Sequence, residues 1–217
     1  MKPAVRIQQN LLAASERRLL TWLCARVPAW VKPDMLTTLG FLGMVLVCAG
    51  YLLSSKNIDW LWLAIAGFCI NWFGDSLDGS LARFRNTERP QFGYFIDHST
   101  DALGNLIAIT GLGLSPFVRL DVALFGIATY LLLSIHTFLA ARVVSEFRLS
   151  YMASGPTELR LILIAMTLTM HSLGPNLRAW RGLSPFDIFI GGMGIILIGL
   201  FVMQTFKIAR HLHRANN

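Results

Sequence analysis

The chain has 217 residues, of which 54% are hydrophobic and only 14% are charged, whereas soluble domains average about 25% charged residues. This composition argues against a soluble domain and favours an integral membrane protein with a single domain. The net charge of +7 is compatible with a nucleic-acid partner. Because the basic residues flank hydrophobic stretches, we instead expect contact with membrane lipids and no nucleic acid.

The first predicted element lies within residues 8–27, which mix leucines and Trp22 with three arginines. This pattern predicts an amphipathic helix on the membrane surface, with a solvated helix as the alternative. We assign residues 1–33 to an N-terminal juxtamembrane segment, 34–206 to the membrane domain and 207–217 to a basic cytoplasmic tail.

The membrane domain contains further stretches that are long or apolar enough to cross a bilayer, which predicts an all-α fold of six transmembrane helices. The fifth stretch is short. The predicted spans are 34–54, 58–84, 92–115, 120–143, 159–174 and 185–206.

The lysine and arginine residues predict how these spans are oriented. If the N-terminus is cytoplasmic and six spans alternate, 15 of the 19 basic residues lie in cytoplasmic segments and 4 lie on the opposite side. The positive-inside rule therefore places both termini in the cytoplasm.

Four of the twelve acidic residues lie at the ends of two neighbouring predicted spans: Asp75, Asp78, Asp97 and Asp101. Their spacings of three and four residues put each pair on one face of a helix. An antiparallel turn over residues 85–91 would bring all four to a similar depth near the cytoplasmic face. Carboxylates in apolar helices are costly, and a divalent cation is a favourable partner because it binds several oxygen ligands.

The spacing of these aspartates is also compatible with other roles. They could form an interfacial salt-bridge cluster with Arg83, Arg85 and Arg89, as in a membrane scaffold, or belong to an ion or proton transporter. Transport sites tend to lie near the midplane at broken helices, whereas these acids lie at one edge of spans that look continuous. We therefore favour a catalytic metal site.

The pattern D-x2-D-G-x2-A-R followed by G-x3-D-x3-D resembles the signature of the CDP-alcohol phosphotransferases, also called CDP-alcohol phosphatidyltransferases. The residues that carry this resemblance are Asp75, Asp78, Gly79, Ala82, Arg83, Gly93, Asp97 and Asp101. Nine residues separate Arg83 from Gly93, where the family usually has eight, and the extra residue falls in a polar turn. Residues 33–37 are similar to a P-N-x-x-T segment of the family, with Asp34 in place of asparagine.

The resemblance implies transfer of a phosphate-linked group from a CDP-alcohol to a hydroxyl, with release of CMP. The four aspartates would hold a divalent metal, Mg²⁺ or Mn²⁺, expected as two ions, and Asp101 would also be the catalytic general base. The resemblance further assigns substrate binding to Thr37, Gly79, Ala82, Arg83 and Gly93.

The resemblance favours CDP-diacylglycerol as the lipid donor and a soluble alcohol as the acceptor. It also implies a location in a bacterial inner (plasma) membrane, with the active site on the cytoplasmic side, and by analogy with the family a homodimer. The alternative is transfer of a phospho-headgroup from CDP-choline or CDP-ethanolamine to diacylglycerol, because residues 155–158 and the Asp97-His98 pair resemble that branch. Residues 155–158 equally fit a turn followed by Thr157 as a helix N-cap.

Three arginines are candidates for binding an anionic acceptor, or else are anchors at the cytoplasmic face: Arg142, Arg148 and Arg160. His98 could be a ligand or could simply pack between helices, and we favour packing.

Overall fold

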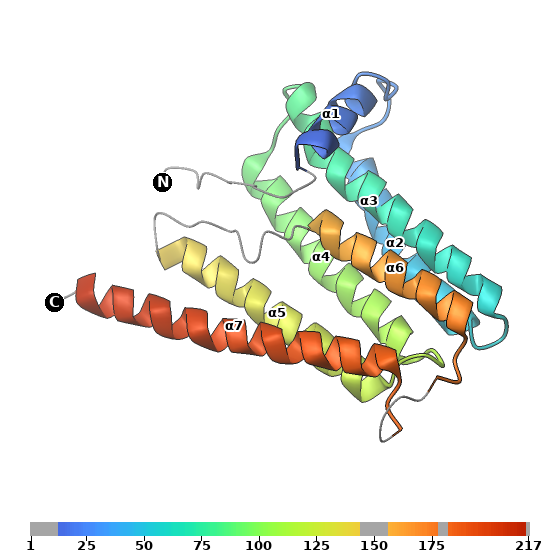
Figure 1. The fold of residues 1–217 in the computed structure, drawn as a ribbon. Coiled ribbons are helices and arrows are strands. Elements are labelled where there is room, and N and C mark those ends of the chain that lie inside the picture. Colours follow the sequence, from blue (N-terminus) through green and yellow to red (C-terminus); the bar gives the residue numbers. More distant parts are fainter. Residues whose placement is uncertain (1–12, 144–155, 178–181, 216–217) are drawn as a thin grey trace.

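The computed structural model describes residues 13–143, 156–177 and 182–215 (Figure 1). These residues form α-helices with one short 3₁₀ helix, and no β-strand occurs among them. The elements are α1 (Ala13–Cys24), α2 (Pro33–Leu53), η1 (Ile58–Trp60), α3 (Leu61–Phe84), α4 (Pro90–Gly113), α5 (Leu120–Val143), α6 (Pro156–Leu173) and α7 (Pro185–Ala215).

A helix is present at each of the six positions where the sequence predicts a span. Three of them, α2, α5 and α7, are long and apolar enough to cross a membrane by length and composition. The other three do not meet this criterion, and two of them, α3 and α4, carry the four aspartates. The all-α class is confirmed, while the number of spans stays a prediction.

Helix α7 is longer than expected. The sequence predicts an end near residue 206 and a separate basic tail, but the helix continues to Ala215. No glycine or proline occurs between residues 200 and 215 to stop it. The basic residues of the expected tail therefore form the last turns of the helix, where positive charge interacts favourably with the helix dipole.

Glycines allow α2 and α3 to pack backbone to backbone. A Cβ atom added to Gly43 would lie 2.6 Å from the backbone nitrogen of Asn71, and one added to Gly74 would collide with the backbone of Gly40. The side-chain amide of Asn71 donates a hydrogen bond of 3.0 Å to the carbonyl of Gly40. Close packing of small residues is a common way for membrane helices to associate. Here it fixes the position of Asp75, which directly follows Gly74.

The main buried core includes residues of six helices, α2 to α7. Tyr51 of α2, Phe68 of α3, Leu112 of α4 and Met170 of α6 belong to one hydrophobic cluster and are almost fully buried. The hydroxyl groups of Tyr51 and Thr167 are 2.6 Å apart and hydrogen bonded. This contact satisfies two buried polar groups and attaches α6 to the other helices.

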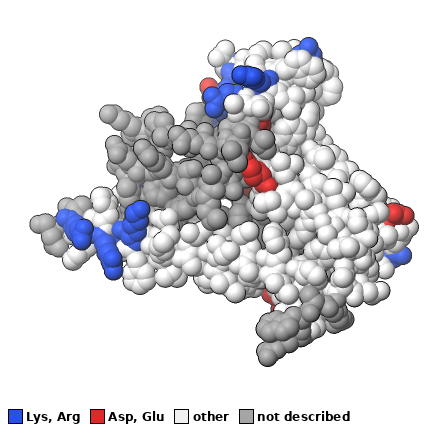
Figure 2. Space-filling view, viewed as in Figure 1, with Lys and Arg blue, Asp and Glu red and all other residues white. Residues whose placement is uncertain are grey.

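Helices α5 and α7 lie side by side. The C-terminal ends of both helices point to the left in Figure 1, away from α1. The carboxylate of Asp187 accepts hydrogen bonds of 2.8 Å from the backbone nitrogens of Ser184 and Arg119, which joins the starts of the two helices. Lys and Arg side chains gather over α1 and over the end of α7, and acidic side chains are visible just below the first of these groups (Figure 2).

Candidate active site

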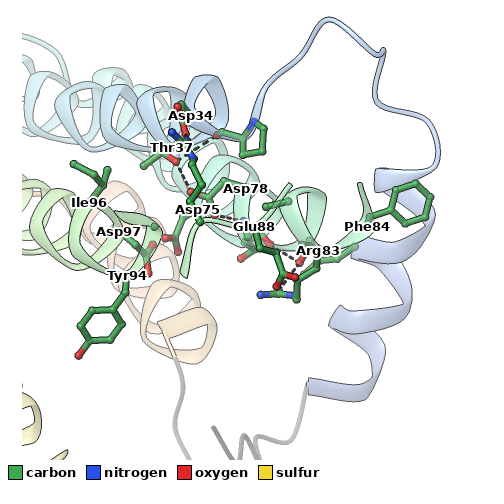
Figure 3. Close-up of a pocket in the computed structure, with 18 of the residues that line it drawn as sticks. Asp34, Thr37, Asp75, Asp78, Arg83, Phe84, Glu88, Tyr94, Ile96 and Asp97 are labelled. Carbon is green, nitrogen blue, oxygen red and sulfur yellow. Dashed lines mark hydrogen bonds and ion pairs between the residues drawn. The ribbon is translucent and has the colours of Figure 1, made fainter. Parts of the chain in front are cut away.

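The helix ends that carry the aspartates surround a cavity of about 940 Å³. Its walls come from α1, the start of α2, the end of α3, the start of α4 and the start of α6 (Figure 3). The turn between α3 and α4 is tight, and Asn86 within it has a φ of 54°, a left-handed conformation that asparagine tolerates better than most residues. This turn makes α3 and α4 antiparallel, as predicted.

Three aspartates meet at this cavity. Asp75, Asp97 and Asp101 each offer a carboxylate oxygen, and these atoms lie within 4.8 Å of one another. Figure 3 shows Asp75 and Asp97 facing each other across the space between α3 and α4. All three side chains are partly buried. Three converging carboxylates suit a hard divalent cation and repel one another without a positive partner.

Asp78 lies apart from this group of three. Its Oδ2 atom accepts a hydrogen bond of 2.5 Å from the hydroxyl of Thr37, and its Oδ1 atom accepts one from the backbone nitrogen of Gly79. Asp78 is also the most buried of the four aspartates and is 9% exposed. The structure thus brings together three of the four predicted ligands and pairs the fourth with Thr37, which the sequence had suggested as a nucleotide contact.

Arg160 supplies a positive partner for the cluster. Its Nη2 atom donates to Oδ2 of Asp75, and the two side chains are 11% and 18% exposed. Its Nη1 atom is buried and has no hydrogen-bond partner within the described part of the chain. Of the other two candidate arginines, Arg142 is exposed at the end of α5 and does not line the cavity, and Arg148 lies outside the described residues.

The remaining signature residues also line the cavity. They are Gly79, Ala82, Arg83 and Gly93. A Cβ atom added to Gly79 would lie 3.4 Å from Nη1 of Arg83, and one added to Gly93 would meet nothing within 4 Å. The missing side chains therefore leave space beside Arg83 and at the start of α4 for a bound molecule.

The salt-bridge alternative requires Arg85 and Arg89 to pair with the four aspartates, and both arginines have other partners among the described residues. Arg85 donates hydrogen bonds to backbone carbonyls of residues 27–31 and so fastens the connection between α1 and α2. Arg89 forms an ion pair with Asp34, at the edge of the cavity. In the described part of the chain, these two arginines thus serve other partners.

His98 combines packing with proximity to the cluster. Its ring centroid lies 4.2 Å from that of Tyr94 and 5.0 Å from that of Phe138, which places the ring between α4 and α5. Its Nδ1 atom is 3.3 Å from Oδ2 of Asp97. The expected role in helix packing agrees with these contacts.

One residue of the site escaped the sequence prediction. Glu16 of α1 accepts hydrogen bonds from Trp72, Ser76 and Thr157. Thr157 is therefore not the N-cap that its position suggested, because α6 begins one residue earlier and the hydroxyl bonds to Glu16. The available signal was that Glu16 is the only acidic residue between positions 8 and 27.

Comparison with known proteins finds similar sequences. Residues 30–206 match the model of the CDP-alcohol phosphatidyltransferase family. The chain is 33% identical over 92 residues to an archaetidylinositol phosphate synthase of Pyrococcus horikoshii, covering 42% of the chain and 46% of the relative. It is 34% identical over 90 residues to a phosphatidylinositol phosphate synthase of Cutibacterium acnes, covering 42% and 41%.

A third relative comes from an animal. The chain is 29% identical over 129 residues to cholinephosphotransferase 1 of Xenopus laevis, covering 53% of the chain and 31% of the relative. Each of these matches spans less than half of the relative's own length.

Proposed function

Because this chain belongs to the CDP-alcohol phosphatidyltransferase family, we propose that it transfers a phosphatidyl group from CDP-diacylglycerol to an alcohol and releases CMP. In this reaction the alcohol oxygen forms a bond to the phosphorus of the phosphatidyl group, and the bond from that phosphorus to the CMP oxygen breaks. The observation that carries the proposal is the meeting of Asp75, Asp97 and Asp101 at a cavity that the other signature residues also line.

The donor set fits a divalent metal. Three carboxylate oxygens within 4.8 Å of one another are ligands that Mg²⁺ and Mn²⁺ prefer. We assign the metal to Asp75, Asp97 and Asp101 and include Asp78, one turn after Asp75, as the fourth ligand of a two-ion site. When bound, the metal would neutralise charge on the pyrophosphate and on the leaving CMP.

The chain's own residues bind and orient the substrates. We assign the cytidine-diphosphate part of the donor to Thr37, Gly79, Ala82, Arg83 and Gly93. The guanidinium of Arg83 is exposed in the cavity and can donate paired hydrogen bonds to phosphate oxygens.

Asp101 receives the proton of the attacking hydroxyl. A carboxylate with this role must lie close to the hydroxyl, and Asp101 lies at the cavity, about three turns into α4. Arg160 pairs with Asp75 and lines the cavity, and we assign it to binding of an anionic acceptor.

The apolar helices and the family indicate an integral membrane protein. We propose six spans with α1 on the membrane surface, and both termini and the cavity on the cytoplasmic side of a bacterial inner membrane. The excess of basic residues at the predicted cytoplasmic segments supports this orientation. We also propose a homodimer, by analogy with the family alone.

A second candidate function is transfer of a phospho-headgroup from CDP-choline or CDP-ethanolamine to diacylglycerol. The observation in its favour is the similarity to a cholinephosphotransferase over 53% of the chain. In this reaction the CDP-linked substrate is water-soluble and the acceptor is the lipid.

Release of CMP by the purified protein in detergent micelles distinguishes the two functions. One panel contains CDP-diacylglycerol with serine, glycerol phosphate or inositol phosphate, and the other contains diacylglycerol with CDP-choline or CDP-ethanolamine. Each panel is run with Mg²⁺, with Mn²⁺ and with EDTA, and the Asp101→Asn variant gives the background. Metal-dependent release in the first panel supports the proposal, release only in the second supports the alternative, and release in neither contradicts both.

A further inference from the structure

Glu16 connects three helices beside the cavity. Its Oε1 atom lies 2.7 Å from the hydroxyl of Thr157, 3.0 Å from the indole nitrogen of Trp72 and 3.4 Å from the hydroxyl of Ser76, and all three groups donate to it. Trp72 and Ser76 are one turn apart on α3, and Thr157 is in the first turn of α6. One carboxylate thus fastens α1 to both helices, and hydrogen bonds to a charged acceptor are among the stronger ones.

The partners of Glu16 are neighbours of the central ion pair. Ser76 directly follows Asp75 in α3. Thr157 precedes Arg160 by three residues and therefore lies on the same face of α6. Since Arg160 pairs with Asp75, the hydrogen bonds of Glu16 and this ion pair form two adjacent connections between α3 and α6.

Helix α1 is also a wall of the cavity. Leu20 and Thr21, one turn after Glu16, line it (in Figure 1, α1 lies beside the end of α3). The last turn of α1 is held separately, because Cys24 is buried against Leu77 and Leu81 of α3. The polar contacts of Glu16 hold the first half of the helix, before this apolar contact begins.

We propose that Glu16 is a positioning residue that holds α1 against the cavity and sets the start of α6 so that Arg160 meets Asp75. Glu16 itself touches no reacting atom. This proposal rests on the proposed function in one respect: the cavity that Glu16 shapes is the one assigned to the CDP-linked donor.

Hydrogen–deuterium exchange of the full-length protein tests the structural part without any turnover. In Glu16→Ala, backbone exchange should rise about tenfold or more in residues 13–24 and 156–163, because hydrogen bonds to a charged group are lost. Glu16→Gln keeps a side-chain oxygen acceptor and should restore most of the protection. Ser15→Ala, a change at the exposed neighbouring position, should leave exchange unchanged. Exchange in Glu16→Ala equal to that in Ser15→Ala would overturn the proposal.

A double-mutant cycle tests the connection to α6. Thr157→Val should weaken CDP-diacylglycerol binding several-fold in the wild-type background and have little further effect in Glu16→Ala, because the two residues act through one contact. Fully additive effects would overturn the positioning role. If exchange responds as expected but no variant, including wild type, binds CDP-diacylglycerol, the placement of Glu16 stands and the proposed donor is wrong.

Discussion

Arg160 and Asp75 form an ion pair inside the cavity, although 85 residues separate them in the chain. Both side chains are mostly buried, and either one alone would be costly to place there. The guanidinium neutralises one of three carboxylates that converge at this point. A metal ion at the cluster would therefore either share Asp75 with Arg160 or displace the guanidinium from Asp75. Metal binding and the position of Arg160 should consequently be coupled.

Arg160→Ala should accordingly bind Mn²⁺ more tightly than the wild type and release CMP more slowly. Removing the guanidinium frees an oxygen of Asp75 and removes a positive charge that repels the metal, which we expect to be worth about tenfold in affinity. Arg160→Lys keeps the charge and should bind Mn²⁺ much as the wild type does. Arg142→Ala, at an exposed arginine outside the cavity, is the matched control. Weaker Mn²⁺ binding by Arg160→Ala, measured by titration calorimetry, would show that Arg160 supports the cluster instead.

Changes at the aspartates should abolish turnover while the protein still inserts into the membrane. Asp75→Ala and Asp97→Ala each remove one of the three converging oxygens, and we expect losses of at least about 100-fold in CMP release and much weaker Mn²⁺ binding. Asp78→Ala should also be inactive, and in addition it leaves the hydroxyl of Thr37 without its carboxylate partner. Wild-type rates of CMP release in any of the three variants would argue against a shared metal site.

The packing of α2 on α3 predicts a stability difference between two glycine variants. Gly74→Ala places a methyl group against the backbone of Gly40 and should destabilise the protein by about 1–3 kcal/mol. Gly192→Ala, in α7, meets nothing within 4 Å and should be neutral or slightly stabilising. Thermal unfolding in detergent compares the two. An unchanged melting temperature for Gly74→Ala would mean that the two helices do not pack as closely as described.

Much of this fold follows from the sequence, because apolar stretches separated by proline-containing or charged segments define the helices. The meeting of Asp75 with Asp97 was also predictable, since a short turn makes the two helices antiparallel and brings the end of α3 and the start of α4 to the same depth. The hydrogen bond between Thr37 and Asp78 was not predictable, because it depends on the position of α2 relative to α3 along the helix axes. The glycine contacts determine that position.

The contacts of α6 were the least accessible to prediction. In the sequence, Arg160 is one of three arginines that fit either acceptor binding or anchoring at the cytoplasmic face, and only the docking of α6 on α3 selects it as the partner of Asp75. Glu16 resembled an ordinary polar residue of a surface helix. Its role becomes visible only when α1, α3 and α6 are placed together.

The distribution of basic residues predicts that the turn between α3 and α4 faces the cytoplasm. Single cysteines at Glu88 and at Lys56, on opposite sides of the predicted membrane, can be introduced after Cys24, Cys48 and Cys69 are replaced by alanine. In right-side-out vesicles, a membrane-impermeant maleimide should label Lys56→Cys and leave Glu88→Cys unlabelled until the membrane is opened. The reverse pattern would invert the proposed orientation and place the cavity on the other side.

Asp101 and Arg83 should differ in the step that each one affects. Asp101→Asn keeps the shape of the side chain and one oxygen but cannot accept the hydroxyl proton, and loss of a general base typically slows the chemical step by about 10²–10⁴-fold. Binding of CDP-diacylglycerol to this variant should remain measurable. Arg83→Ala should instead weaken donor binding, because an exposed guanidinium in the cavity no longer contacts phosphate.

Equilibrium binding and single-turnover CMP release, measured on both variants, separate these effects. A general base predicts near-normal affinity with a slow single turnover for Asp101→Asn, and the opposite pattern for Arg83→Ala. Asp101 also belongs to the group of three converging carboxylates. The same measurements therefore have to separate a role as general base from a role as metal ligand. If Asp101→Asn loses donor and Mn²⁺ binding as completely as Asp75→Ala does, then Asp101 acts mainly as a metal ligand, and another group must accept the proton.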